Sequence, residues 1–74
     1  MRPLQPTHYE IRVGGHLAQR YSDWFGLNLQ HDFYQGQAVT KLTGSLPDQS
    51  ALHGILVKIQ ALGITLLELR QLEP

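Results

Sequence analysis

The chain contains no cysteine, and this absence excludes two classes of small protein at once. Without thiols it can form neither disulfide bridges nor thiolate metal sites, which argues against a disulfide-stapled secreted miniprotein. Long hydrophobic runs are missing too: no segment approaches the roughly 20 apolar residues of a membrane-spanning helix, and Met1-Arg2-Pro3 leads into no apolar signal region. We therefore expect a cytoplasmic protein.

An excess of charge of either sign is also absent. Lys plus Arg and Asp plus Glu number 6 each, so the formal net charge is zero. Nucleic-acid binding draws much of its free energy from clustered cations against phosphates, and a membrane-surface patch needs a similar excess of basic residues. The composition therefore predicts no nucleic-acid partner and no membrane partner.

The length of 74 residues leaves room for one domain with a modest core. A chain of this size buries only about 60% of the surface that its unfolded form exposes, and its core alone supplies roughly 3–5 kcal/mol. Residues 1–6 contain Pro3 and Pro6 and are expected to be a flexible leader, with a single domain over 7–74. Association with a second copy or with another protein would add buried area.

Hydrophobic alternation predicts strands in the first half of the chain. In the segment 7–13, Tyr9, Ile11 and Val13 alternate with polar residues, which is typical of a strand with one buried face. A short helix or turn is expected within 16–25. Two further strands, 27–33 and 38–43, flank a hairpin loop at Gly36, and the last strand is expected at 64–72.

The segment 48–62 predicts the main helix. Asp48 can cap its N-terminus, and Gly63 stands where a left-handed residue commonly ends a helix. Five apolar residues recur at helical spacing and predict the buried stripe: Leu52, Ile55, Leu56, Ile59 and Leu62.

This order of elements predicts an α+β fold, specifically a ferredoxin-like βαββαβ sandwich. Its sheet would have four antiparallel strands, with the helices on one face because strand-helix-strand crossovers are right-handed. The uncovered face of the sheet would then be polar and carry His8, Glu10, Arg12, Lys41 and Thr43.

Four segments covering nearly the whole chain resemble a family of small bacterial ferredoxin-like proteins whose function is uncharacterised. The most specific is the helix motif Asp-Gln-x-Ala-Leu-His-Gly-x-Leu-x-Lys-Ile. The family usually has a tryptophan at the position of Tyr21 and an Arg-Asp pair at Gln60 and Ala61. The resemblance supports the fold and implies no catalytic residues. The segments are Tyr9-x-Ile11-Arg12-Val13-x-Gly15-His16-Leu17, Ser22-Asp23-Trp24-Phe25, Leu42-Thr43-Gly44 and Asp48-Gln49-Ser50-Ala51-Leu52-His53-Gly54-Ile55-Leu56-Val57-Lys58-Ile59.

Four histidines are scattered at spacings that do not form a common metal-ligand pair, so we predict neither a metal site nor a cofactor. Trp24 could anchor a partner or stack on a ligand beside Asp23, although Trp24 and Phe25 also suit the closing of a small core. The polar edge of the main helix offers two more groups, and a loop arginine a third. The predicted binding residues are Trp24, Asp23, Gln49, His53 and Arg20.

The segment from Gly14 to Arg20 follows a strand and faintly resembles the phosphate-binding loop of acylphosphatases, where backbone amides and an arginine hold an acyl phosphate. It is shorter than that loop, and its adjacent glycines are also explained by a tight turn. An acylphosphatase-like enzyme or a small ligand-binding domain, using this loop or the His53 edge, is therefore the alternative function.

The leading hypothesis is a non-catalytic protein-interaction or regulatory module that forms a homodimer. No nucleophile-base pair, ligand cluster or cofactor motif occurs in the sequence, so no catalytic residue is predicted. The back of the main helix carries small side chains that permit close approach of another surface. The predicted interface residues are Ser50, Gly54, Val57 and Ala61.

Overall fold

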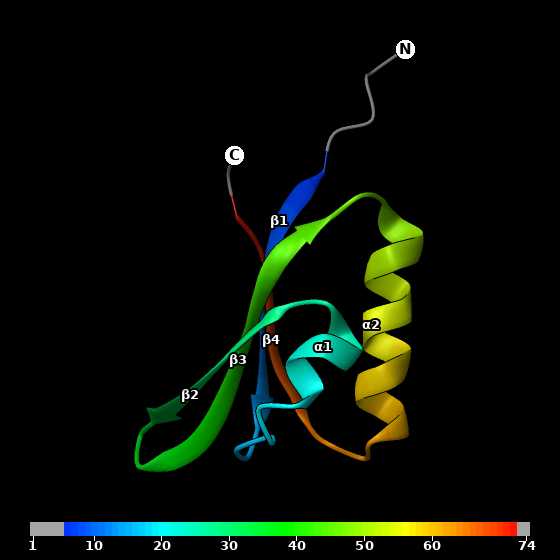
Figure 1. Ribbon diagram of the computed structural model, residues 1–74. Coiled ribbons are helices and arrows are strands. Elements are labelled where there is room, and N and C mark those ends of the chain that lie inside the picture. Colours follow the sequence, from blue (N-terminus) through cyan, green and yellow to red (C-terminus); the bar gives the residue numbers. More distant parts are fainter. Residues whose placement is uncertain (1–5, 73–74) are drawn as a thin grey trace.

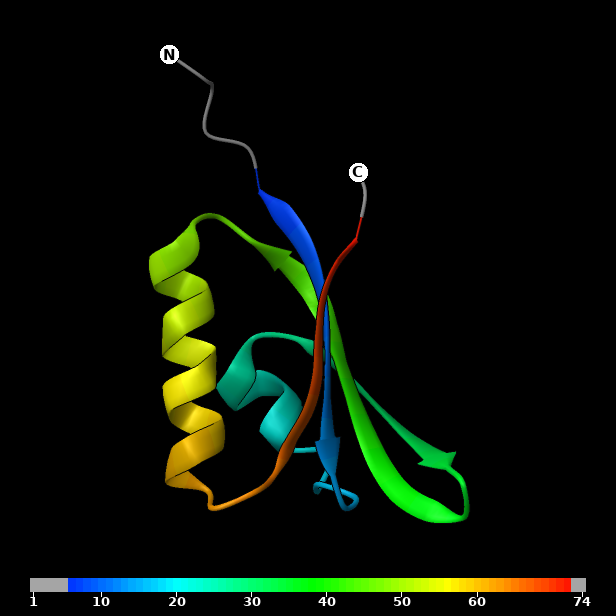
Figure 2. The ribbon, with the colours of Figure 1, turned by 180° about the vertical axis from the view of Figure 1, so that it is seen from behind.

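The computed structural model describes residues 6–72, so the expected leader lies outside the described residues except for Pro6. Four strands form a single antiparallel sheet in the order β2-β3-β1-β4. Figures 1 and 2 show both helices on the same face of this sheet. The elements are β1 (Thr7–Gly14), α1 (Tyr21–Phe25), β2 (Asn28–Tyr34), β3 (Gln37–Leu46), α2 (Gln49–Ala61) and β4 (Leu66–Leu72).

The predicted α+β class, the four-stranded antiparallel sheet and the single helical layer are therefore confirmed. The fold departs from a standard ferredoxin-like sandwich at the first crossover, because α1 has only five residues. Two local features explain its shortness: the side chain of Arg20 makes no capping hydrogen bond, and Gly26 adopts a left-handed conformation with φ 70° that ends the helix.

The main helix follows the sequence prediction closely. The Asp48 carboxylate accepts a hydrogen bond from the Ala51 amide at 2.9 Å, and Gly63 has φ 71° just beyond the C-terminus. The predicted stripe faces the sheet: Leu52, Ile55 and Ile59 are buried, while Leu56 and Leu62 are partly buried against the core.

The core lies between the sheet and the helices. Tyr9, Ile11 and Val13 of β1 are buried there, which confirms the alternation seen in the sequence. The β2–β3 hairpin turns through Gln35 and Gly36, whose φ values of 53° and 79° suit a two-residue turn with both central residues left-handed. Within residues 6–72, no helix is long and apolar enough to cross a membrane.

Candidate interaction surfaces

The segment between β1 and α1 is fastened to the sheet by one buried threonine. The Thr40 hydroxyl donates to the Gly15 carbonyl at 2.7 Å and accepts from the Leu17 amide at 2.9 Å. Thr40 is fully buried, so these two bonds hold the segment without competition from water at the hydroxyl. The result is a fixed loop beside β2.

This loop packs against β2 and covers part of the edge that β2 forms. The Gln19 side-chain amide donates to the Leu29 carbonyl at 3.3 Å, and His16 Nε2 donates to the Asp32 carbonyl at 2.8 Å. The ring of His16 also stacks on His31, with centroids 4.4 Å apart, and meets the edge of Phe33 at 4.9 Å. The Leu29 carbonyl faces away from β3, whereas the Asp32 carbonyl faces β3, because Asp32 pairs with Val39 and the neighbouring Ala38 carbonyl points to β1. The loop therefore covers one outward-facing carbonyl of this edge strand.

The opposite edge, β4, is uncovered. Figure 2 shows β4 in front of the sheet with no other element over it. Residues Leu66 to Gln71 are all exposed, and the leucines retain large exposed fractions: 44% for Leu66, 53% for Leu67 and 40% for Leu69. The structure thus leaves a leucine-rich edge strand open to solvent, where it can template pairing with another chain.

The direction of the free backbone groups of β4 follows from its pairing with β1. The Gly14 amide donates toward β4, to Thr65 O at 2.9 Å, whereas the Gly15 amide donates toward β3, to Ala38 O at 2.9 Å. The direction of the backbone N–H and C=O groups alternates along a strand, so those of Glu10 and Arg12 also point toward β4.

Arg70 pairs with Glu10 and Glu68 with Arg12, so the backbone groups of these two β4 residues face β1. Those of Leu69 and Gln71 consequently face outward from the sheet. Leu67 is the extra residue of a bulge, because Arg12 pairs with Glu68 while the next residue, Val13, pairs with Leu66.

The uncovered face of the sheet carries a network of charges around Arg12. Its Nε lies 3.0 Å from Glu10 Oε2 and 3.4 Å from Glu68 Oε1, and its Nη1 lies 3.7 Å from Asp32 Oδ2. Arg70 also approaches Glu10, at 3.7 Å. The hydrogen bond that Arg12 donates to Glu10, reinforced by the surrounding carboxylates, raises the pKa of Arg12. The predicted polar face is confirmed, and it joins β2, β1 and β4.

Three of the seven amides in the predicted phosphate-binding loop, Gly14 to Arg20, donate to acceptors within the protein. The amides of Gly14 and Gly15 donate to backbone carbonyls, and that of Leu17 donates to Thr40. Arg20 is exposed, with its guanidinium carbon 5.0 Å from the centre of the Tyr21 ring. The loop is therefore built around internal hydrogen bonds, as the tight-turn interpretation requires.

Trp24 and Phe25 do not both close the core. Phe25 is buried, but Trp24 is 42% exposed, so this structural interpretation is wrong for the tryptophan. Lys58 fixes the indole from α2: its ammonium donates to the Trp24 carbonyl at 2.7 Å and lies 5.2 Å from the ring centre. Trp24 is thus a partly exposed aromatic side chain that lies between the two helices and is positioned by Lys58.

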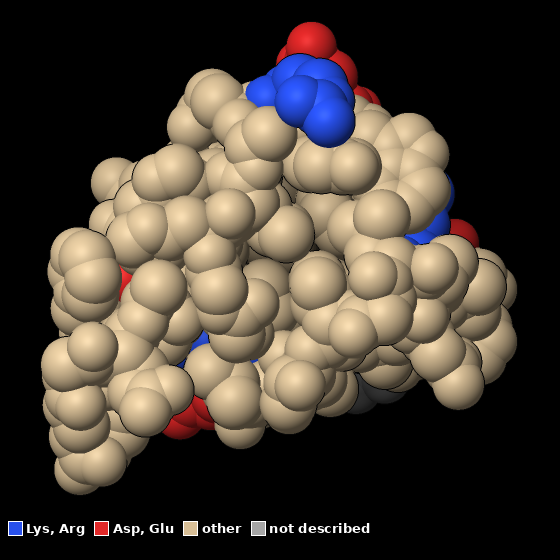
Figure 3. All heavy atoms as spheres, turned by 90° about the horizontal axis from the view of Figure 1, so that it is seen from below, with Lys and Arg blue, Asp and Glu red and all other residues tan. Residues whose placement is uncertain are grey.

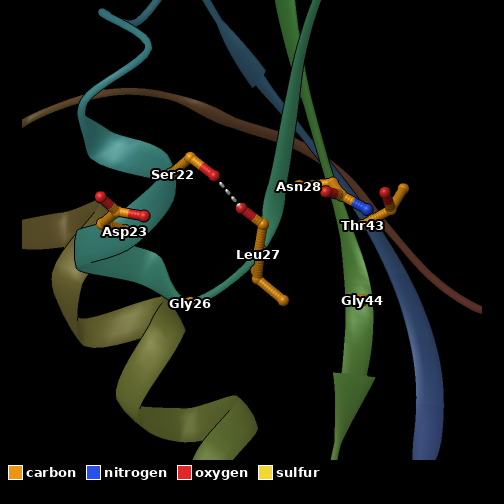
Figure 4. Close-up of a pocket in the computed structure, with 7 residues that line it drawn as sticks. All are labelled: Ser22, Asp23, Gly26, Leu27, Asn28, Thr43 and Gly44. Atoms are coloured by element: carbon orange, nitrogen blue, oxygen red, sulfur yellow. Dashed lines mark hydrogen bonds between the residues drawn. The ribbon is translucent and has the colours of Figure 1, made fainter.

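Asp23 lines a shallow pocket of about 350 Å³ at the turn from α1 into β2 (Figure 4). The Ser22 hydroxyl in this pocket donates to the Leu27 carbonyl, and no histidine lines the pocket to act as its base. The arrangement can accept hydrogen bonds from a ligand, but it does not form an activated nucleophile. The lining residues are Ser22, Asp23, Gly26, Leu27, Asn28, Thr43 and Gly44.

The remaining predicted residues lie on other sides of α2. The Gln49 side-chain amide donates to the Tyr9 hydroxyl at 3.1 Å, so it supports the core, and His53 is exposed. Lys58, which was not among the predicted residues, instead donates from α2 to the Trp24 carbonyl of α1. The structure does not bring the predicted binding residues into one site.

The back face of α2 points into solvent. Apart from the adjoining residues and backbone of α2 itself, no atom of residues 6–72 lies within 4 Å of a methyl group placed on Gly54, so this position is open. The predicted interface therefore remains a prediction. All four of its residues, Ser50, Gly54, Val57 and Ala61, are exposed.

A further surface lies at the end of the molecule where the β2–β3 hairpin turns. Figure 3 shows this end from below, covered mostly by uncharged atoms. Phe33 and Tyr34 of the hairpin are 65% and 61% exposed. Sequence reasoning missed the contact of His16 with His31 and Phe33, because α1 separates His16 from the other two residues in the chain. Among the described residues, no three His, Cys, Asp or Glu side chains gather as ligands for a metal ion.

Comparison with known protein families gives one match, to a domain of unknown function, DUF8691, over residues 8–70. The chain belongs to the DUF8691 family. The match agrees with the expected membership of a family without an assigned function. It does not test whether the helix motif is characteristic of that family, so the motif remains a prediction. All six elements of this DUF8691 domain lie at least in part within the matched region. Curated proteins and solved structures gave no match.

Proposed function

We propose that this DUF8691 domain is a non-catalytic protein-interaction module that accepts a strand from a partner protein at the β4 edge. The observation that carries the proposal is that every residue of β4 from Leu66 to Gln71 is exposed, with outward-facing backbone groups on Leu69 and Gln71. An added strand would satisfy these groups, and the exposed leucines would give it apolar area to cover. Strand addition thus uses both features of the edge.

The alternative of an acylphosphatase-like enzyme has less support. An anion-binding loop directs several adjacent amides at the anion, and here the amides of Gly14, Gly15 and Leu17 instead donate to acceptors within the protein. A small ligand-binding role would rest on the pocket beside Asp23, which is shallow and open. The proposal retains a ferredoxin-like interpretation of the fold, with a shortened first helix, and a cytoplasmic location.

Photo-crosslinking in the host cell tests the proposal. A photoreactive amino acid replaces Leu69 on β4 in one version of the full chain, and Gln30 on β2 in a control version, because both residues are exposed on edge strands. We expect a discrete protein adduct from position 69 and none from position 30. The adduct should also disappear when Gln71→Pro removes an outward-facing amide donor. Equal adducts from both positions, or none from either, would overturn the proposal.

A further inference from the structure

We infer that the strand accepted at this edge is β4 of a second copy of the chain, paired antiparallel with Leu69 opposite Leu69. The inference rests on the proposed function and names its partner. The pairing would join two sheets edge to edge into one eight-stranded sheet with a two-fold axis through the Leu69 pair.

The backbone geometry suits this register. The N–H and C=O of Leu69 face away from β1, as derived above from the Gly14 and Gly15 hydrogen bonds. Two antiparallel strands whose outward-facing residues stand opposite each other exchange both hydrogen bonds of that pair. Leu69 in one copy and Leu69 in the other therefore form a reciprocal pair without disturbing the ladder between β1 and β4.

The charges on β4 favour the same register. With Leu69 at the centre, Glu68 of each copy stands opposite Arg70 of the other, which gives two cross-strand pairs of opposite charge by symmetry. These are non-hydrogen-bonded positions, where side chains approach most closely. Shifting the centre to Glu68 or to Arg70 would instead place two like charges directly opposite each other. Charge complementarity thus selects one alignment among the neighbouring symmetric ones.

The apolar side chains give the pair a driving force. Leu69 stands opposite Ile11 in the sheet, so it lies on the helical face beside a fully buried core residue. It nevertheless remains 40% exposed because no strand follows it at the edge. A second Leu69 at this position would continue the apolar layer across the two-fold axis.

Charge reversal of single residues tests the register. Glu68→Arg and Arg70→Glu each place like charges opposite each other in a self-pair, whereas an equimolar mixture of the two variants restores opposite charges at both positions. We expect the wild-type chain to sediment as a dimer and each variant alone to associate at least about tenfold more weakly, because two cross-strand pairs change sign. The mixture should recover dimers close to the wild-type level.

Two further variants keep the test independent of folding defects. Circular dichroism first establishes that each charge variant is folded, since Glu68 and Arg70 also approach Arg12 and Glu10. Gln71→Pro leaves these charges in place and should still yield monomers. Gly54→Leu, on the exposed back of α2, is the matched control and should remain dimeric.

Other outcomes separate the inference from the function on which it rests. Failure of the mixture to recover dimers would overturn the Leu69-centred register, and loss of dimers in Gly54→Leu would move the interface to α2. A wild-type chain that stays monomeric at high micromolar concentration would overturn self-pairing. In that case, crosslinks from position 69 to a different protein would preserve the interaction function, and no crosslinks would remove both.

Discussion

The two edges of the sheet have the same length, seven residues each in β2 and β4, but opposite surroundings. Along β2, side chains from the segment before α1 bond to the carbonyls of Leu29 and Asp32. Along β4, leucines and outward-facing backbone groups meet solvent. Natural sheets commonly protect their edges, and in this domain the edge of β2 is covered in part while that of β4 is open.

The difference limits how the protein can assemble. If both edges were open, each copy could pair on both sides and sheets could extend without end. With the β2 edge partly covered by the loop, a pair formed through β4 uses the more open edge of both copies and closes at two. The partial cover on β2 thus favours a closed pair over an extended sheet.

Removing the hydrogen bonds that hold the loop before α1 against the sheet should produce the largest loss of stability. Thr40→Val keeps the shape of the side chain but removes the hydroxyl that bonds to Gly15 and Leu17. We expect the free energy of unfolding to fall by about 2–3 kcal/mol, because two part-buried hydrogen bonds are lost together. Urea denaturation measures the loss, and Thr43→Val, on the uncovered face, is the control that should change stability by less than about 0.5 kcal/mol. Equal effects of the two substitutions would show that the fastening is unimportant.

Proline substitution in β4 tests which backbone groups face inward. Arg70→Pro removes an amide directed at β1 and should cost about 2 kcal/mol, because a ladder hydrogen bond is lost and its acceptor is left without a partner. Gln71→Pro removes an outward-facing amide and should leave the stability of the monomer nearly unchanged. Thermal unfolding at concentrations low enough to keep the chain monomeric compares the two. If Gln71→Pro were instead the less stable variant, the assignment of which β4 backbone groups face β1 would be wrong.

The smallest effect should come from α2, whose back face is the rival interaction surface. Gly54→Ala places a methyl group where no atom lies within 4 Å, so it should stabilise the helix by about 1 kcal/mol through helix propensity alone. Chemical denaturation measures this gain, and it should not depend on protein concentration. A gain that reverses as the concentration rises would indicate that a partner contacts this face.

Much of the fold could be predicted because its signals are local. The Asp48 cap, the apolar stripe of α2 and the alternation of Tyr9, Ile11 and Val13 each lie within one element, and the structure confirms them. The shortness of α1 could not be predicted as readily, since the aromatic spacing in 16–25 suits a turn as well as a helix.

The surfaces were less predictable because they depend on which elements become neighbours. The sequence predicts a strand at β4 but does not say that every side chain from Leu66 to Gln71 stays exposed. The same holds for Trp24, whose exposure depends on Lys58 reaching across from α2. Hydrogen bonds between the loop and β2 likewise join residues whose proximity only the topology determines.

Because both helices lie on one face of the sheet, the proposed dimer would present two copies of each surface to a ligand. A two-fold axis through paired β4 edges runs perpendicular to the sheet, so the helical layers of both copies lie on the same side. The dimer then presents two copies of Trp24 on that side and two copies of the Arg12 network on the other. A ligand with two matching sites could bind both copies at once, and its avidity would exceed the affinity of either site alone.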